Sequence, residues 1–134
     1  MARSYSVLLI DDDPGLRMLV RLLLEHEGHR VLLAPDGEIG LALAQGERPE
    51  CILLDMAMPR RNGMDVYLDL QNSSASGIPV IIFSAVLNRR DEEIWRSLPH
   101  VVDVIRKPFD INLLVQRIAE VCEQHEAPAR TAER

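Results

Sequence analysis

Carboxylates, a hydroxyl and an ammonium each follow a short apolar run in this sequence. Asp11 to Asp13 follow residues 7–10, Asp55 follows 51–54, Ser84 follows 80–83, and Lys107 comes shortly after 101–105. Carboxylates held close together repel one another, and a hard divalent cation such as Mg²⁺ relieves that repulsion. Beside such an ion a carboxylate can attack a phosphoryl group, while a hydroxyl and an ammonium stabilise the phosphoryl oxygens. If one fold brings these residues together, they predict phosphoryl transfer to an aspartate.

Each of these residues also has an ordinary structural explanation. Asp13 can cap a helix, Ser84 can sit in a turn, and Lys107 can be a solvated surface charge. For any residue taken alone, the structural explanation is favoured. The functional hypothesis therefore depends on the elements that position the whole set.

The apolar runs have the composition of strands that are buried on both faces of a sheet. They are rich in Val, Ile and Leu, and they cover Val7–Ile10, Val31–Leu33, Cys51–Leu54, Val80–Phe83 and Val101–Ile105. This pattern is typical of a parallel sheet that is covered by helices.

Segments with helical spacing lie between and after these runs. The first begins at Pro14 and ends at Gly28, and the last follows Asp110; the middle segments cover about 36–45, 64–71 and 90–98. Five strands alternating with five helices predict a doubly wound α/β domain. In such folds ligands bind at the carboxyl ends of the strands, where all the reactive residues would meet.

Composition favours a single soluble domain. The chain has 134 residues, 47% of them hydrophobic, with 15 Lys or Arg against 21 Asp or Glu and a net charge of −6. A pI near 5.2, without a basic block, argues against direct binding to nucleic acid or to an anionic membrane. No apolar run approaches the roughly 18 residues that could cross a bilayer, so we expect a cytoplasmic protein. Cys51 and Cys122 are expected to be buried free thiols.

Four segments in combination resemble the receiver domain of bacterial two-component response regulators. They are Val7–Pro14 with its acidic pair, Ile52–Gly63 with its Asp-Met-Ala-Met-Pro sequence, Ile82–Ala85, and Lys107-Pro108-Phe109. The resemblance covers about residues 5 to 124. It implies a flavodoxin-like α/β fold, with a five-stranded parallel sheet in the order 2-1-3-4-5 and five helices. We expect a receiver domain over residues 1–124, and a tail or linker stub over 125–134.

The same resemblance implies a role for each site residue. Asp55 would accept a phosphoryl group from a phosphohistidine on a sensor histidine kinase or a phosphotransfer protein. Asp11, Asp12, Asp55 and the backbone carbonyl of Ala57 would bind Mg²⁺. Ser84 and Lys107 would contact the phosphoryl oxygens, and the peptide joining Lys107 to Pro108 would be cis.

The resemblance also implies that the protein acts as a switch in signalling. Such a domain phosphorylates and dephosphorylates its own side chain, so it is not an enzyme that acts on a separate metabolite. We expect the signal to pass to an unknown downstream protein that docks on the fourth helix, fifth strand and fifth helix, unless an output domain belongs to the same protein.

Two positions depart from the family pattern. Val104 stands where receivers usually carry an aromatic residue that changes rotamer on phosphorylation, and His100-Val101 replaces a usual Gly-Ala pair. The predicted phosphorylation chemistry is unaffected by these departures. They do indicate that the signal leaves the site by an unusual route.

Two other functions remain open at this stage. Asp11-x-Asp13, Phe83-Ser84 and Lys107 also resemble the motifs of haloacid-dehalogenase-type phosphatases, in which Asp11 would be the nucleophile. That class needs a further acidic pair after the lysine, where this chain offers Asp110 and Glu120. The second alternative is a pseudo-receiver that docks on partners without phosphorylation.

Several other residues have side chains or backbone properties that could serve a function. Gly63 is expected to allow a positive φ, and Trp95 fits equally well as a core residue or as an anchor for a partner. Arg60 and Arg61 could attract a phosphorylated donor but are more simply solvated loop charges. The four histidines lack metal-ligand spacing and are expected to have packing or surface roles.

Overall fold

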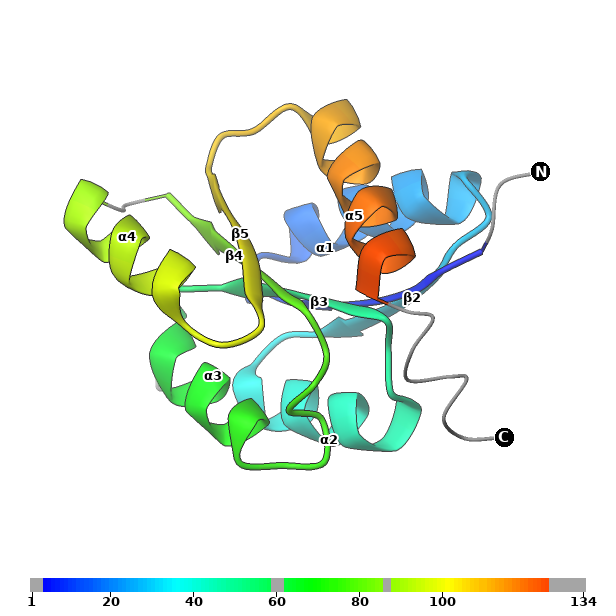
Figure 1. The fold of residues 1–134 in the computed structure, drawn as a ribbon. Helices are drawn as coiled ribbons and strands as arrows, with labels where there is room; N and C mark the ends of the chain where they lie inside the picture. Colours follow the sequence, from blue (N-terminus) through cyan, green and yellow to red (C-terminus); the bar gives the residue numbers. More distant parts are fainter. Residues whose placement is uncertain (1–3, 59–61, 86–87, 126–134) are drawn as a thin grey trace.

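A computed structural model describes residues 4–58, 62–85 and 88–125, which form five strands alternating with five helices (Figure 1). The strands are β1 (Ser6–Ile10), β2 (Arg30–Ala34), β3 (Cys51–Asp55), β4 (Val80–Ser84) and β5 (Val101–Arg106). The helices are α1 (Pro14–His26), α2 (Gly37–Glu47), α3 (Gly63–Gln71), α4 (Arg89–Ser97) and α5 (Ile111–His125).

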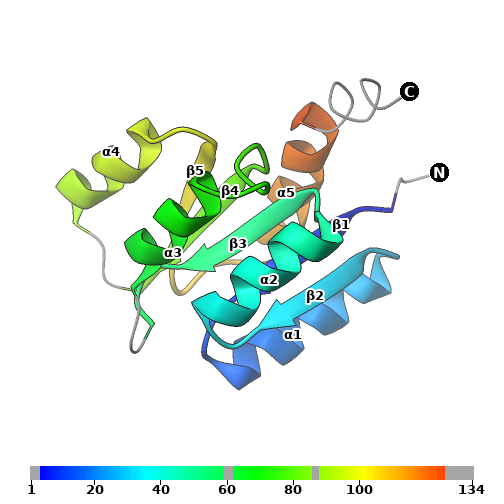
Figure 2. The same cartoon turned by 90° about the horizontal axis from the view of Figure 1, so that it is seen from below.

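All neighbouring strands of the sheet are parallel, in the order β2-β1-β3-β4-β5. Figure 2 shows the arrowheads of β2 and β3 pointing in the same direction. The register pairs Ile10 with Leu54, Leu54 with Ile82, and Ile82 with Val104. The strand order predicted from the sequence is therefore confirmed, and the register places the carboxyl ends of the strands at one edge.

Two apolar layers explain why the strand segments are almost continuously hydrophobic. Along β1, Val7 and Leu9 pack with α1 and α5, whereas Leu8 and Ile10 pack with α2 and α3 on the other face. All four side chains are fully buried. Because successive side chains of a strand point to opposite faces, a sheet covered on both faces needs apolar residues at every position.

Side-chain caps begin the helices next to the carboxyl ends of the strands. Asp13 Oδ1 accepts hydrogen bonds from the backbone N–H groups of Gly15 (2.9 Å) and Leu16 (3.3 Å), and Pro14 is the first helical residue of α1. Asp36, Asn62 and Asn88 cap α2, α3 and α4 in the same way. These caps satisfy N–H groups that have no partner within the helix, and they fix the residue at which each helix begins.

The strands extend beyond the apolar runs that predicted them. Asp55 is the last residue of β3 and Ser84 the last of β4, because backbone hydrogen bonding continues past the hydrophobic positions. The predicted boundary between residues 124 and 125 falls at the end of α5. It stays a prediction, since residues 126–134 lie outside the described part.

The expectation of a positive φ at Gly63 is wrong. Among the described glycines, Gly28 has a positive φ (+89°) and Gly63 does not. A Cβ atom at Gly63 would instead lie 2.7 Å from the Cα atom of Met56 and 2.9 Å from the carbonyl oxygen of Asp55. Glycine is needed here because the start of α3 passes directly against the backbone at the end of β3.

The remaining structural expectations concern cysteine, tryptophan and membrane insertion. Cys51 and Cys122 are buried free thiols in the same apolar cluster, as predicted. Trp95 is only 3% exposed, so it is a core residue and not an open anchor for a partner. In the part of the chain that the structure describes, we find no helix with the length and apolar character needed to cross a membrane.

Candidate functional site

Three strands bring the predicted acidic and basic groups together. One carboxylate oxygen from each of Asp11, Asp12 and Asp55 lies within 4.8 Å of the other two. The Nζ atom of Lys107, just after β5, lies 2.8 Å from Asp11 Oδ2 and 3.7 Å from Asp55 Oδ1. Asp11 is fully buried and Asp55 is 4% exposed, whereas Asp12 is open to solvent. The cluster is therefore a buried acidic pair with one exposed carboxylate at its mouth.

Backbone groups orient the two buried carboxylates. Asp11 Oδ1 accepts a hydrogen bond from the N–H of Asp13 (2.9 Å), and Asp55 Oδ1 accepts one from the N–H of Ala57 (3.2 Å). Each carboxylate thus accepts a hydrogen bond from the backbone N–H two residues further along the chain, and this bond limits the rotation of the side chain. The metal-ligand role of the Ala57 carbonyl remains a prediction.

Arg17 also holds this site, and the sequence analysis missed it. Its Nη1 atom donates a hydrogen bond to the backbone carbonyl of Asp11 at 2.8 Å. Arg17 lies on the first turns of α1, six residues after Asp11, so the bond fixes the start of the helix against the end of β1. The signal that could have predicted this contact is the position of Arg17. It lies one helical turn after the cap residue Asp13, in a helix that follows an acidic strand end.

The pairing of β4 with β3 places Ser84 at the same edge of the sheet. Phe83 pairs with Asp55, and Ser84 is the next residue, fully buried. The backbone N–H of Lys107 donates to the carbonyl of Ser84 at 2.7 Å, which joins the ends of β4 and β5. The Lys107–Pro108 peptide is cis, as the resemblance implied.

Burial and charge together perturb Asp55. Burial is the largest cause, and with the nearby charge of Asp11 it raises the pKa of Asp55 from 3.8 to about 6; Lys107 opposes this rise. Without a bound cation, part of the Asp55 population is therefore protonated near neutral pH. A positive charge arriving at the cluster would favour the ionised form.

The donor set suits a hard cation. Every candidate ligand of the cluster is an oxygen atom, and Mg²⁺ and Ca²⁺ prefer oxygen ligands. Asp12 is exposed, so a cation can reach the cluster from solvent on that side. The single positive charge of Lys107 neutralises the two buried carboxylates of Asp11 and Asp55 only in part. The residues present therefore fit a divalent metal ion.

Comparison with known proteins agrees with this geometry. A model of the response regulator receiver domain matches residues 7–119. The chain belongs to the response regulator receiver family. The receiver is a signalling domain of two-component systems.

Among its curated relatives, PilH of Pseudomonas aeruginosa is 34% identical over 116 residues, covering 86% of this chain and 95% of PilH. CpxR of Klebsiella pneumoniae, a transcriptional regulatory protein, is 37% identical over 116 residues, covering 87% of this chain. The receiver spans about half the length of that relative (48%).

Solved structures agree with the fold. The receiver domain of the Francisella response regulator 1452 superposes with a TM-score of 0.82 at 26% identity, covering 90% of this chain and 98% of that chain. The chemotaxis protein CheY4 of Vibrio cholerae has a TM-score of 0.78 at 24% identity, covering 89% and 99%, and shows the fold alone.

The phosphatase alternative does not survive these findings. Family membership places the chain among receivers, and the Asp13 carboxylate caps α1 instead of facing a substrate. Asp110 accepts a hydrogen bond from the N–H of Asn112 at the start of α5, so it caps that helix. Both carboxylates therefore have structural roles at the starts of helices.

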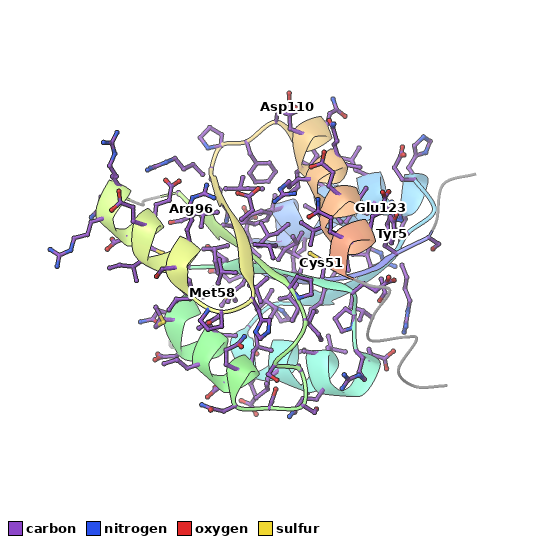
Figure 3. The ribbon with its side chains drawn as sticks, viewed as in Figure 1. Tyr5, Cys51, Met58, Arg96, Asp110 and Glu123 are labelled. Carbon is purple, nitrogen blue, oxygen red and sulfur yellow. The ribbon has the colours of Figure 1, made fainter. Side chains whose placement is uncertain are left out.

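Other residues from the sequence analysis lie away from the acidic cluster. His29 is buried, accepts a hydrogen bond at Nδ1 from the N–H of Tyr5 (3.0 Å) and stacks on its ring, which confirms a packing role. Tyr5 in turn donates to Glu123 at the end of α5 (Figure 3). Arg60 and Arg61 lie outside the described residues.

The face formed by α4, β5 and α5 is covered by ion pairs. Asp103 of β5 pairs with Arg96 of α4 (3.2 Å) and with Arg117 of α5 (2.7 Å), and Glu92 pairs with Arg96 and Arg106. Val104, the next residue of β5 after Asp103, is buried at 6% exposure, and its carbonyl accepts a hydrogen bond from Arg96. The usual aromatic position of the family is therefore a small core side chain in this receiver.

Proposed function

We propose that this receiver accepts a phosphoryl group on Asp55 in a reaction that requires Mg²⁺. One observation carries the proposal: the buried Asp55 carboxylate lies within 4.8 Å of the Asp11 and Asp12 carboxylates, with Lys107 Nζ at 3.7 Å. That arrangement combines a nucleophile, an oxygen-ligand set for a cation and an ammonium group. The donor would be a phosphohistidine on a sensor histidine kinase or a phosphotransfer protein, the partner class that goes with the two-component relatives.

The transfer is a direct displacement at phosphorus. A carboxylate oxygen of Asp55 forms the new P–O bond, the P–N bond to the donor imidazole breaks, and the imidazole keeps the electron pair and takes up a proton. A bound Mg²⁺ would supply charge neutralisation for the phosphoryl oxygens and for the crowded carboxylates, with Asp11, Asp12, Asp55 and the Ala57 carbonyl as its ligands.

Lys107 and Ser84 complete the charge stabilisation. Before transfer, Lys107 Nζ is closer to Asp11 (2.8 Å) than to Asp55 (3.7 Å), so it neutralises the buried carboxylate that has no direct role in bond formation. When a phosphoryl group occupies Asp55, the same ammonium can turn to one of its oxygens, and the Ser84 hydroxyl can donate to another. Such charge-assisted hydrogen bonds form only once the group has arrived.

The product is a switch and not a released metabolite. Hydrolysis of the acyl phosphate would return Asp55 to its starting state, so the domain turns over only its own side chain. We place its action in the cytoplasm, without direct contact to nucleic acid or membrane. The readout would be a downstream protein that docks on the face formed by α4, β5 and α5.

The proposal is tested by mapping the adduct. The protein is incubated with Mg²⁺ and acetyl phosphate, and intact mass and peptide mass mapping locate any added phosphoryl group. We expect one group on Asp55, lost with EDTA and in Asp55→Asn. Asp65→Asn, which changes an exposed carboxylate of α3, is the matched control and should leave labelling unchanged.

Two outcomes would overturn the proposal. Labelling at Asp11, with continued turnover of phosphate ester by Asp55→Asn, would restore the phosphatase hypothesis. No labelling with acetyl phosphate or with a phosphorylated histidine kinase domain would leave a pseudo-receiver, a docking module that acts without phosphorylation.

A further inference from the structure

A direct side-chain contact joins the residue after Asp55 to helix α4. The indole Nε1–H of Trp95 donates a hydrogen bond to the Sδ atom of Met56 at 3.0 Å. Met56 follows Asp55 in the chain, and Trp95 lies 39 residues later in the last turn of α4. The contact therefore links the acidic cluster to α4 without passing through β5.

The backbone of Met56 is fixed on both sides. Its N–H donates to the carbonyl of Phe83 in β4 at 2.8 Å, and its carbonyl accepts from the N–H of Gly63 at the start of α3 at 2.7 Å. The close approach of Gly63 leaves no free space against the Met56 backbone. A shift of the peptide between Asp55 and Met56 must therefore be passed to neighbouring groups, and the thioether of Met56 is one of them.

Trp95 in turn determines how α4 is seated. All residues of α4 lie in the described part of the chain, and Trp95 is its buried residue, at 3% exposure. Its ring meets Tyr67 of α3 edge-on, with centroids 5.7 Å apart, and the Tyr67 hydroxyl donates to the carbonyl of Pro99 after α4. A large buried aromatic ring contributes far more to packing than exposed ion pairs do, so the seating of α4 depends mainly on this indole.

The aromatic residue that usually changes rotamer in receivers is replaced by Val104 in this chain. Val104 is a buried, β-branched side chain with no ring that could change rotamer between an inward and an outward position. It shares the apolar cluster with Trp95, and its backbone carbonyl accepts a hydrogen bond from Arg96 of α4. The aromatic side chain that contacts the residue after Asp55 is thus carried by α4 and not by β5.

We propose that the contact between Met56 and Trp95 couples the phosphorylation state of Asp55 to the position of α4. The inference rests on the proposed function, because it takes Asp55 as the phosphoryl acceptor. A phosphoryl group on Asp55 draws the carboxylate toward its charge partners and displaces the adjoining peptide, which shifts the Met56 thioether. The N–H···S bond lengthens, the indole is repositioned, and α4 moves with it. Trp95 and Met56 are positioning residues in this scheme and do not contact the reacting atoms.

Trp95 offers a direct probe, because it is the single tryptophan of the chain. In ¹⁵N-labelled protein, the indole Nε1–H resonance is followed while Mg²⁺ and acetyl phosphate are added, and intact mass measures the adduct in the same sample. We expect the indole resonance and the backbone amides of residues 89–97 to shift in proportion to the adduct.

Variants separate this coupling from general stability. Met56→Leu keeps a similar volume but removes the sulfur acceptor, and its α4 amide shifts should fall below half of the wild-type response. Met56→Gln supplies an amide oxygen of similar reach and should restore the response. Met58→Leu is the matched control, since Met58 (Figure 3) is a buried methionine two residues away. Trp95→Phe, which keeps a ring but removes the N–H, should lose the response as well.

The two proposals fail in distinguishable ways. An adduct on Asp55 with an unchanged indole resonance, or with equal α4 shifts in wild type and Met56→Leu, would overturn the coupling and leave the proposed function intact. Equal losses in Met56→Leu and Met58→Leu would also overturn it, since they would show a general packing effect. The absence of any adduct, measured by mass, would overturn the proposed function and the coupling together.

Discussion

Replacing Asp55 with asparagine should stabilise the metal-free protein at neutral and alkaline pH. The folded protein raises the pKa of Asp55 from 3.8 to about 6, chiefly through burial and through the charge of Asp11. A carboxyl group with a raised pKa binds its proton more tightly in the folded state than in the unfolded state. Its ionisation therefore costs folding free energy, which is absent below the unfolded pKa and fully present above the folded one.

The magnitude follows from that difference. One pKa unit corresponds to about 1.4 kcal/mol, so a rise from 3.8 to about 6 corresponds to an upper value of about 3 kcal/mol. Asparagine has nearly the same shape, carries no charge, and can still accept the hydrogen bond from the N–H of Ala57. Because the buried amide has its own desolvation cost, we expect Asp55→Asn to gain about 1–3 kcal/mol in the free energy of unfolding at about pH 8.

The assay is urea unfolding followed by circular dichroism in EDTA, at several pH values between about 4 and 8. The advantage of Asp55→Asn should grow as the pH rises from about 4 to 7 and then level off. Saturating Mg²⁺ should reduce it, because a cation that binds the native wild-type cluster would stabilise the folded state. Asp65→Asn serves as the exposed control. A stability difference that does not vary with pH, or a destabilised Asp55→Asn, would refute the argument that burial and Asp11 together strain this carboxylate.

Three further expectations concern the acidic cluster and the glycine that packs against the end of β3. Mg²⁺ should raise the melting temperature of the wild type, and Asp12→Asn should show a smaller rise and a more stable metal-free form; an unaltered Mg²⁺ response would remove Asp12 from the site. Lys107→Ala should slow labelling and lower the free energy of unfolding by about 2–4 kcal/mol, because it leaves buried Asp11 without its cation; urea unfolding at neutral pH measures this, and an unchanged midpoint contradicts it. Gly63→Ala should cost about 1–3 kcal/mol, since the new methyl group meets the Met56 backbone at 2.7 Å; full stability in the same assay would show that α3 can move away freely.

Much of the fold could be predicted from local patterns. Continuous Val, Ile and Leu runs indicate strands covered on both faces, and Asp13 before Pro14 marks the start of a helix. Alternation of these elements implies parallel strands, whose carboxyl ends share one edge. For that reason the residues of the candidate site could be grouped before any distance was known, although their roles in phosphoryl transfer remain predictions.

The exact ends of elements were less predictable. β3 and β4 continue through Asp55 and Ser84 because backbone hydrogen bonds, and not side-chain hydrophobicity, hold a strand in its sheet. Gly63 is a second case in which local sequence was not enough to predict the structural role of a residue. Its sequence context suggested a backbone conformation, whereas the need for glycine comes from another segment of the chain that passes within van der Waals contact.

The sequence by itself therefore determined the order of the elements, the caps that begin α1 and α5, and the edge at which the carboxylates of Asp11 and Asp55 meet. Only the tertiary structure decided the raised pKa of Asp55, the hydrogen bond from Arg17 to the backbone of Asp11, and the contact of Trp95 with Met56. The physical reason is range. Strand patterns and caps arise from neighbours within a few residues, whereas burial, charge coupling and side-chain contacts depend on residues that folding alone brings together.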